Sequence, residues 1–253
     1  MIIIKSEQEI DMMRQSGVVT GQILRELETI IRQGISTGDI DTFVEDRIRS
    51  KEMIPSFKGY NGFPASCCIS INEEVVHGIP SKKRILQEGD IVSIDVGSTY
   101  KGYVSDAART YAVGNISHEA GRLIDVSKEA FFEGIKFCKE GYRVSDISHA
   151  IQTRVEEAGF NVLREFVGHG IGRAMHEEPQ IPNYGAAGRG PRIQKGMVFA
   201  IEPMVTQGSF RVEVQLNNWT VVTLDGKLSA HYENTVVITD GEPELITLPG
   251  EVL

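Results

Sequence analysis

The sequence lacks the features of a secreted or membrane-spanning protein. Its three cysteines, adjacent Cys67 and Cys68 and isolated Cys138, form neither a disulfide framework nor a Cys-x-x-Cys metal motif. No uninterrupted apolar run approaches membrane-spanning length. The apolar residues 1–4 stop at Lys5 without a cleavage-site pattern, so we expect no signal peptide. These absences predict a protein of the reducing cytoplasm.

The sequence also lacks an excess of basic residues. It has 26 Lys and Arg against 35 Asp and Glu, a net charge of −9. Binding to nucleic acid or to an anionic membrane needs a positive surface, so we expect neither partner. With 253 residues, 41 % of them hydrophobic, the chain can bury a large core as one domain or as two fused halves.

Helical and strand patterns alternate along the chain. Ser6 and Glu9 form a capping box, which predicts a helix to about Ile31, and Ser36 or Thr37 begins a second helix. Strands are expected at residues 68–72, 91–96 and 110–113, and a second pair of helices at 117–138 and 145–158.

Two windows of sequence repeat at one fixed offset. Residues 87–95 align with residues 194–202, 107 positions later, and each window is an apolar strand that ends on a carboxylate. Residues 34–47 contain a second match at the same offset. This repetition predicts a duplication with halves of about 1–115 and 116–253. We expect the two strand-end carboxylates to occupy equivalent places, and a site at the junction of the halves.

Four carboxylates stand at the ends or edges of predicted strands. Asp95 and Glu202 end the repeated windows, Asp106 fits the neighbouring arm of a hairpin, and Glu233 leads into a β-branched strand. Each one alone is more typical of a water-bound acid at a strand edge. If they share a small cavity, however, cations must neutralise them, and two divalent ions would balance the four charges.

His169 would add an imidazole to these carboxylates. It lies between Gly168 and Gly170, which leave the imidazole unshielded and permit a positive φ; the alternative is a glycine-rich turn around a hydrogen-bonded core histidine. Oxygen ligands with one imidazole suit Mn, Fe, Co or Zn. Two such ions, roughly 3.5–4 Å apart, can bridge a water and lower its pKa, as in phosphatases, nucleases and aminopeptidases.

From Lys5 to about Asp240 the sequence resembles the type I methionine aminopeptidases, in the bacterial form that consists of the catalytic domain alone. The matching motifs occur in one order: GYNGFP (59–64), CISINE (68–73), VHGIP (76–80), GDIVSID (89–95), SD (105–106), GHGIG (168–172), HEEP (176–179), IEPM (201–204) and YE (232–233). The resemblance implies an α+β pita-bread fold, in which two pseudo-symmetric αα-ββ halves form a curved antiparallel sheet covered by helices. It also implies a single catalytic domain, residues 1–253.

The resemblance implies a reaction as well. The protein would remove the initiator methionine from nascent proteins, best before a small second residue, with a water between two divalent ions as nucleophile. The implied metal ligands are Asp95, Asp106, His169, Glu202 and Glu233, of which Asp106 and Glu233 would bridge the ions. Glu202 would also accept a proton and pass it to the leaving amine. His77 and His176 would hydrogen-bond the substrate and stabilise the charge on the tetrahedral intermediate.

A methionine side chain needs an apolar and polarisable pocket. The resemblance places Phe57, Tyr60, Phe63, Cys68, Met175 and Trp219 around it, although such residues are also common in protein cores. The sequence departs from the family at Phe57, where a cysteine can occur, at Met175, often phenylalanine, and at Asn61, often histidine.

The family also binds a monovalent cation near the positions of Asn72 and Ser229. The other three histidines, His118, His149 and His231, are placed outside the predicted site.

Two alternatives stay open on the sequence alone. An Xaa-Pro aminopeptidase or prolidase would share the fold but usually has an extra N-terminal domain, whereas the first catalytic helix here begins at Ser6. A catalytically silent peptide-binding relative would usually have lost metal ligands, and all five are present. A type II methionine aminopeptidase is not among the open alternatives, because it would carry a large insert between His176 and Glu202, where only 25 residues lie.

We expect a monomer that acts on nascent chains at the ribosome.

Overall fold

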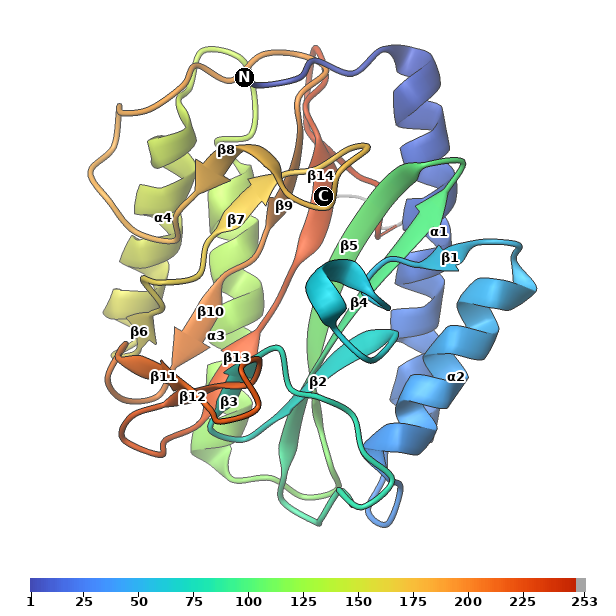
Figure 1. Ribbon diagram of the computed structural model, residues 1–253. Helices are drawn as coiled ribbons and strands as arrows, with labels where there is room; N and C mark the ends of the chain where they lie inside the picture. Colours follow the sequence, from blue (N-terminus) through green and yellow to red (C-terminus); the bar gives the residue numbers. More distant parts are fainter. Residues whose placement is uncertain (249–253) are drawn as a thin grey trace.

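The computed structural model describes residues 1–248 as two pairs of helices on either side of a set of antiparallel strands (Figure 1). One pair, α1 (Glu7–Ile30) and α2 (Thr37–Ser50), comes from the N-terminal half. The other pair, α3 (His118–Ile135) and α4 (Val144–Glu157), comes from the C-terminal half. All four helices begin within three residues of the predicted starts, and α1, α3 and α4 also end within three residues of the predicted ends. No helix in this described part of the chain is long and apolar enough to cross a bilayer.

Side-chain caps fix where the helices begin. Serine hydroxyls accept a backbone N–H three residues later: Ser6 from Glu9, Ser36 from Asp39 and Ser117 from Ala120. The Glu9 carboxylate accepts the N–H of Ser6 in return at 2.9 Å, so the predicted capping box is confirmed. In α4 the carboxylate of Asp146 accepts the N–H of Arg143 at 2.7 Å instead.

The N-terminal half builds a sheet around one long hairpin. Its strands are β1 (Ile54–Pro55), β2 (Cys67–Ile71), β4 (Ile91–Tyr100) and β5 (Tyr103–Ala112), in the order β1-β4-β2 with β5 also on β4. β4 and β5 pair along their whole length. They turn at Lys101 and Gly102, both with positive φ, as a tight hairpin requires. Both arms are longer than predicted, because the pairing continues past the apolar windows to this turn.

The C-terminal half builds a second sheet with the order β15-β14-β9-β7-β8. Its strands are β7 (Gly168–Gly170), β8 (Glu177–Ile181), β9 (Val198–Ile201), β14 (Asn234–Val237) and β15 (Glu244–Leu245). A smaller sheet of this half contains β6 (Asn161–Val162), β10 (Met204–Thr206) and β13 (Ser229–His231). Another small sheet joins the two halves, because it pairs β3 (Glu74–Val76) of the N-terminal half with β12 (Val221–Thr223), which pairs in turn with β11 (Val212–Val214). A short 3-10 helix, η1 (Tyr60–Gly62), lies between β1 and β2.

Equivalent elements of the two halves are separated by one distance in sequence. α2 and α4 begin at Thr37 and Val144, and β4 and β9 begin at Ile91 and Val198. Each pair is 107 residues apart, the offset of the repeated windows. In both halves the strand of the repeated window pairs antiparallel with a later strand, β4 with β5 and β9 with β14.

The two halves are joined in the middle of the molecule. Ala108 of β5 and Glu233, just before β14, exchange backbone hydrogen bonds of 3.3 and 3.0 Å. The hydroxyl of Thr235 accepts the N–H of Asp106 and donates to its carbonyl. Each half also has its own core, around Leu27, Ile40 and Ile94 in one and Phe131, Ile151 and Phe199 in the other. The central hairpin of one half is therefore bonded directly to the central strands of the other.

We predict opposite effects for two glycine-to-alanine substitutions in the helices. A Cβ at Gly17 of α1 would lie 2.5 Å from the carbonyl oxygen of Ile246, so Gly17→Ala should lower the free energy of unfolding by about 1–3 kcal/mol. A Cβ at Gly121 of α3 meets nothing closer than 4.0 Å, so Gly121→Ala should raise it by up to about 1 kcal/mol. Urea denaturation measures both. Equal effects would contradict the packing of the C-terminal segment on α1.

Candidate metal centre

Four acidic side chains meet where the halves join. Asp95 lies on β4, Asp106 on β5, Glu202 directly after β9 and Glu233 directly before β14. The register of the hairpin places Gly97 opposite Asp106 and Ala108 opposite Asp95, so the two aspartates are close neighbours. In the other sheet Asn234 pairs with Ile201, which brings the residues beside them, Glu233 and Glu202, to the same end of the strand pair.

The backbone around these acids is held rigidly. Arg109 donates hydrogen bonds to the carbonyl of Glu233 at 2.6 Å and to the side chain of Asn234 at 2.7 Å. Asn183 donates to the carbonyl of Glu202 at 3.0 Å. The carboxylates themselves are thus positioned by bonds to their backbones, while their oxygen atoms are left for another partner.

His169 joins the cluster from β7, where it pairs with Ala200 of β9. Its Nδ1 lies 2.9 Å from the carbonyl oxygen of Gly170 and must donate to it, so Nε2 carries the lone pair. That Nε2 lies 3.5 Å from Glu202 Oε1. A lone pair facing a carboxylate is repulsive unless a proton or a cation lies between the two atoms.

The glycines beside His169 serve close packing, which differs from the sequence-based expectation of an unshielded imidazole and a positive φ. Neither Gly168 nor Gly170 has a positive φ. Instead, a Cβ at Gly168 would lie 2.6 Å from the oxygen of Ala200, and a Cβ at Gly170 would lie 2.3 Å from the oxygen of Glu178. At these two glycines the neighbouring strands β8 and β9 leave no room for a side chain. His169 between them is 5 % exposed.

Several buried atoms of the cluster lack a hydrogen-bond partner. Within residues 1–248 these are Asp95 Oδ1, Asp106 Oδ1, Glu233 Oε1 and His231 Nε2. Unpaired buried polar atoms are expensive, so their concentration at one place points to a missing ligand. Two sets of potential ligand atoms lie within 4.8 Å of one another, Asp106–His169–Glu233 and Asp95–His231–Glu233. The residues present therefore fit divalent cations.

The electrostatics of the metal-free cluster agree with this assignment. Burial raises the pKa of Asp95 to about 7. Burial, reinforced by repulsion from neighbouring carboxylates, also raises the pKa of Asp106, Glu202 and Glu233 well above the usual range. Burial lowers the pKa of His169 to about 4, so its imidazole is neutral at pH 7. A metal ion binds neutral imidazole and deprotonated carboxylates, so a cation bound here would find His169 ready and would displace protons from the acids.

A single cavity opens above the acids. All the residues predicted for metal ligation, catalysis and substrate binding line it, together with Asn61: Phe57, Tyr60, Phe63, Cys68, His77, Asp95, Asp106, His169, Met175, His176, Glu202, Trp219 and Glu233. The lining thus includes both acidic and apolar side chains. Phe57 and Met175 pack against the bare backbone of Gly97, where a Cβ would lie 2.9 and 3.1 Å from them. The cavity thus combines a cation site with a slot for an apolar side chain.

Two further histidines, His77 and His176, line this cavity. His176 Nδ1 lies 2.9 Å from the Tyr60 hydroxyl, and its ring centroid is 4.3 Å from that of His169. His77 contacts Phe166 and Trp219 edge to face. Burial lowers the pKa of His77 to about 4 and also lowers the pKa of His176. A neutral His176 that accepts from Tyr60 at Nδ1 carries its proton on Nε2, free to donate to a ligand.

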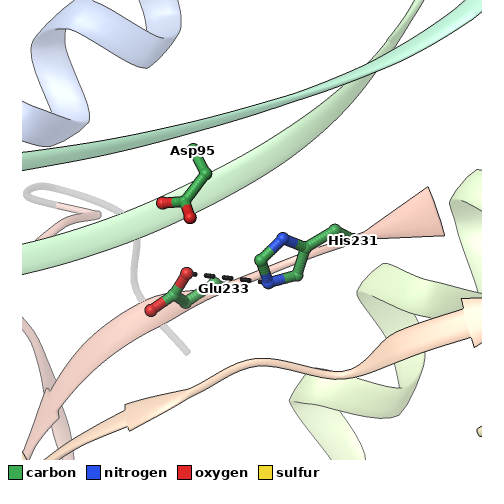
Figure 2. Close-up of side chains that lie close together, drawn as sticks. All are labelled: Asp95, His231 and Glu233. Atoms are coloured by element: carbon green, nitrogen blue, oxygen red, sulfur yellow. Dashed lines mark ion pairs between the residues drawn. The ribbon is translucent and has the colours of Figure 1, made fainter. Parts of the chain in front are cut away.

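One residue of the cluster was missed in the sequence. His231 is 2 % exposed, and its Nε2 lies 3.6 Å from Glu233 Oε2 and 3.7 Å from Glu202 Oε2. Figure 2 shows His231, Asp95 and Glu233 pointing toward one another. The available signal was spacing, since residues 231 and 233 share a face of an extended segment. His118 and His149 are exposed on the surface, as expected.

We predict that the stability of the metal-free protein falls as the pH rises from about 6.5 to 8. The pKa of Asp95 is raised from 3.8 to about 7, so the folded state holds a proton that the unfolded state has lost. Above 6.5, the ordinary pKa of histidine, the lowered pKa of the buried His77, His169 and His231 no longer opposes this trend. The stability that protonation provides is complete below pH 3.8 and is lost as the pH rises through 7. Asp106 and Glu233 shift in the same direction.

Thermal unfolding with a chelator, and with added divalent metal, measures this effect. The metal should raise Tm more at pH 8 than at pH 5, because at low pH it competes with protons for the carboxylates. Asp106→Asn should weaken the pH dependence, whereas the exposed control Glu157→Gln should not. A metal-induced gain in Tm that is independent of pH would contradict the assignment.

Comparisons with known proteins agree with the geometry. A model of metallopeptidase family M24 matches residues 11–240. The chain is 57 % identical to the methionine aminopeptidase of Clostridium acetobutylicum over 98 % of this chain and 99 % of that protein. It superposes on the crystal structure of the Thermotoga maritima methionine aminopeptidase with a TM-score of 0.96 and 46 % identity, covering 98 % and 99 % of the two chains.

More distant structures share the fold alone. The prolidase of Pyrococcus furiosus superposes with a TM-score of 0.77 at 22 % identity, covering 97 % of this chain and 65 % of that one. The pita-bread fold implied by the sequence motifs is confirmed. Because the family model and the similar proteins match nearly the whole length, the chain belongs to metallopeptidase family M24, among the bacterial methionine aminopeptidases.

Proposed function

We propose that this protein is a metal-dependent aminopeptidase that removes the N-terminal methionine of polypeptides and prefers a small second residue. The observation that carries this function is the single cavity in which a buried four-carboxylate, one-imidazole cluster adjoins an apolar slot. Similarity to methionine aminopeptidases over nearly the full length supports the same conclusion. The chain would act as one catalytic domain, with halves of about 1–115 and 116–253.

The proposed metal ligands are the five residues Asp95, Asp106, His169, Glu202 and Glu233. Four carboxylates would balance two divalent ions, and Asp95, Asp106 and Glu233 each have a buried oxygen without a partner in the described structure that could hold them. Their oxygen and imidazole donors suit Co, Mn, Fe or Zn. Ions bound there would polarise the first peptide carbonyl and lower the pKa of a coordinated water.

Glu202 is proposed to move the proton. Its side chain is 13 % exposed and faces the cavity, and burial together with repulsion from Asp95 raises its pKa. Because its carboxylate faces the cavity that the substrate would enter, Glu202 can accept a proton from the nucleophilic water and deliver it to the leaving amine. The imidazole nitrogens nearest to its Oε1 and Oε2 are those of His169 at 3.5 Å and His231 at 3.7 Å.

His176 and His77 are proposed to orient the peptide. His176 is fixed by Tyr60 at Nδ1, so its Nε2–H can donate to the substrate carbonyl where negative charge develops. His77 is held on the other side of the cavity by Phe166 and Trp219. Both rings are neutral at pH 7, since burial lowers their pKa, and they therefore act as hydrogen-bond donors and not as cations.

The methionine side chain is proposed to enter the apolar end of the cavity. Its lining residues are Phe57, Tyr60, Phe63, Cys68, Met175 and Trp219. Phe63 and Trp219 form an edge-to-face pair with ring centroids 5.1 Å apart, which fixes one wall. The thioether of Met175 and the thiol of Cys68 are polarisable partners for a substrate sulfur.

A monovalent cation near Asn72 and Ser229 also remains a proposal. The two residues are adjacent, because the N–H of Ser229 donates to the carbonyl of Asn72 at 2.8 Å. We further propose that the protein works as a monomer in the cytoplasm, at the ribosome, where nascent chains expose their first methionine.

We predict that methionine is released faster from Met-Ala-Ser than from Met-Lys-Ser, because a small second residue fits beside His176 and Tyr60. A chelator should stop release, and Co, Mn, Fe or Zn should restore it. Chromatography of the products measures both rates. Absence of release with every one of these metals would defeat the proposed activity, and faster cleavage of Xaa-Pro peptides would favour a prolidase-like enzyme.

We predict that Glu202→Ala lowers kcat by at least roughly 10²–10⁴-fold, the usual contribution of a general acid or base. The exposed control Glu157→Ala, at the end of α4, should keep the wild-type rate. Steady-state kinetics on Met-Ala-Ser provides the comparison. A Glu202→Ala protein with the wild-type kcat would refute the assigned role.

A further inference from the structure

His231 is a buried imidazole whose Nε2 lacks a hydrogen-bond partner among residues 1–248. Two carboxylate oxygens face this nitrogen, Glu233 Oε2 at 3.6 Å and Glu202 Oε2 at 3.7 Å. Both distances exceed the range of a hydrogen bond. By contrast, two ligands at about 2.0–2.2 Å from one tetrahedral ion lie roughly 3.4 Å apart. The spacing is that of atoms that share a cation.

The backbone of His231 is held by contacts with β5 and β10. The N–H of His231 donates to the Thr110 hydroxyl at 2.8 Å, and the same hydroxyl donates to the His231 carbonyl at 2.9 Å. Thr110 lies on β5, four residues after Asp106. On its other side His231 pairs with Met204 of β10, two residues after Glu202. Its position is therefore fixed from both halves of the molecule.

We propose that His231 Nε2 is a sixth ligand of the metal centre and binds the ion that Asp95 and Glu233 hold. This inference rests on the two-ion centre of the proposed function. The ligand atoms of Asp95, His231 and Glu233 already lie within 4.8 Å of one another, and the three side chains point toward a common space (Figure 2). The carboxylate of Glu233 belongs to both ligand groups, as a bridging ligand does.

The consequence is one nitrogen ligand for each ion. The first ion would have Asp106, His169 and Glu233, and the second would have Asp95, His231 and Glu233. An imidazole in place of an oxygen ligand favours Co, Ni, Cu and Zn over Mn and Mg. His231 thereby determines which metals the second position retains.

Nitrogen NMR of the full chain tests this directly. Protein labelled with ¹⁵N-histidine is stripped of metal and titrated with zinc, and the ring nitrogens are followed by long-range ¹H–¹⁵N correlation. We expect the Nε2 resonances of His169 and His231 to move on zinc binding, while those of the exposed His149 stay in place. His169→Gln and His231→Gln each remove one of the moving signals and so assign them.

Calorimetric titration measures how much His231 contributes to the affinity for zinc. His231→Gln should weaken binding of the second zinc equivalent by at least roughly tenfold while the first equivalent binds as in the wild type. The matched surface variant His149→Gln should leave both equivalents unchanged. The retained shift of His169 in the His231→Gln protein shows that the variant is folded.

The outcomes separate the two proposals. If only the His169 resonance moves, and His231→Gln binds two equivalents as tightly as the wild type, His231 is not a ligand and the proposed function stands. If zinc moves neither resonance, the metal centre itself is wrong, and this inference fails with it.

Discussion

The cost of burying like charges side by side governs this structure. Asp95, Asp106, Glu202 and Glu233 come from separate strands, yet they share one small space in which burial raises the pKa of each. Such an arrangement is stable at neutral pH only with counter-charges between the carboxylates. The partnerless oxygens of Asp95, Asp106 and Glu233 within residues 1–248 show where those charges belong.

The scaffold around the acids is built to keep them in place against this repulsion. Thr235 and Arg109 tie the backbone of one half to that of the other beside Asp106 and Glu233. At His169 the strands approach so closely that only glycine fits on either side. Because each proposed ligand is fixed through its backbone, we expect the cluster to keep its geometry with or without a cation.

Much of this could be predicted from the sequence, because the relevant signals are local. The capping box at Ser6 and Glu9 and the apolar windows that end on Asp95 and Glu202 gave the helices and the carboxylate-bearing strands. The cavity-lining residues followed from motifs in a fixed order. Their convergence depends on pairing between strands distant in sequence, and no local pattern encodes that pairing.

The role of the glycines and of His231 could not be read in the same way. Gly168 and Gly170 are required by the carbonyls of Ala200 and Glu178, which are neighbours only in the folded state. Alternation puts His231 on the same face as Glu233, but only the pairing with β10 and the hydrogen bond to Thr110 of β5 bring its Nε2 within 3.7 Å of Glu202 as well. Tertiary contacts determine both features.

Anomalous diffraction from crystals of the protein grown with cobalt or manganese, recorded at the metal edge, tests the central claim most directly. We expect two peaks roughly 3.5–4 Å apart among the four carboxylates, with Glu233 in contact with both. Density without an anomalous peak in this cluster, or metal bound only elsewhere on the protein, would contradict it.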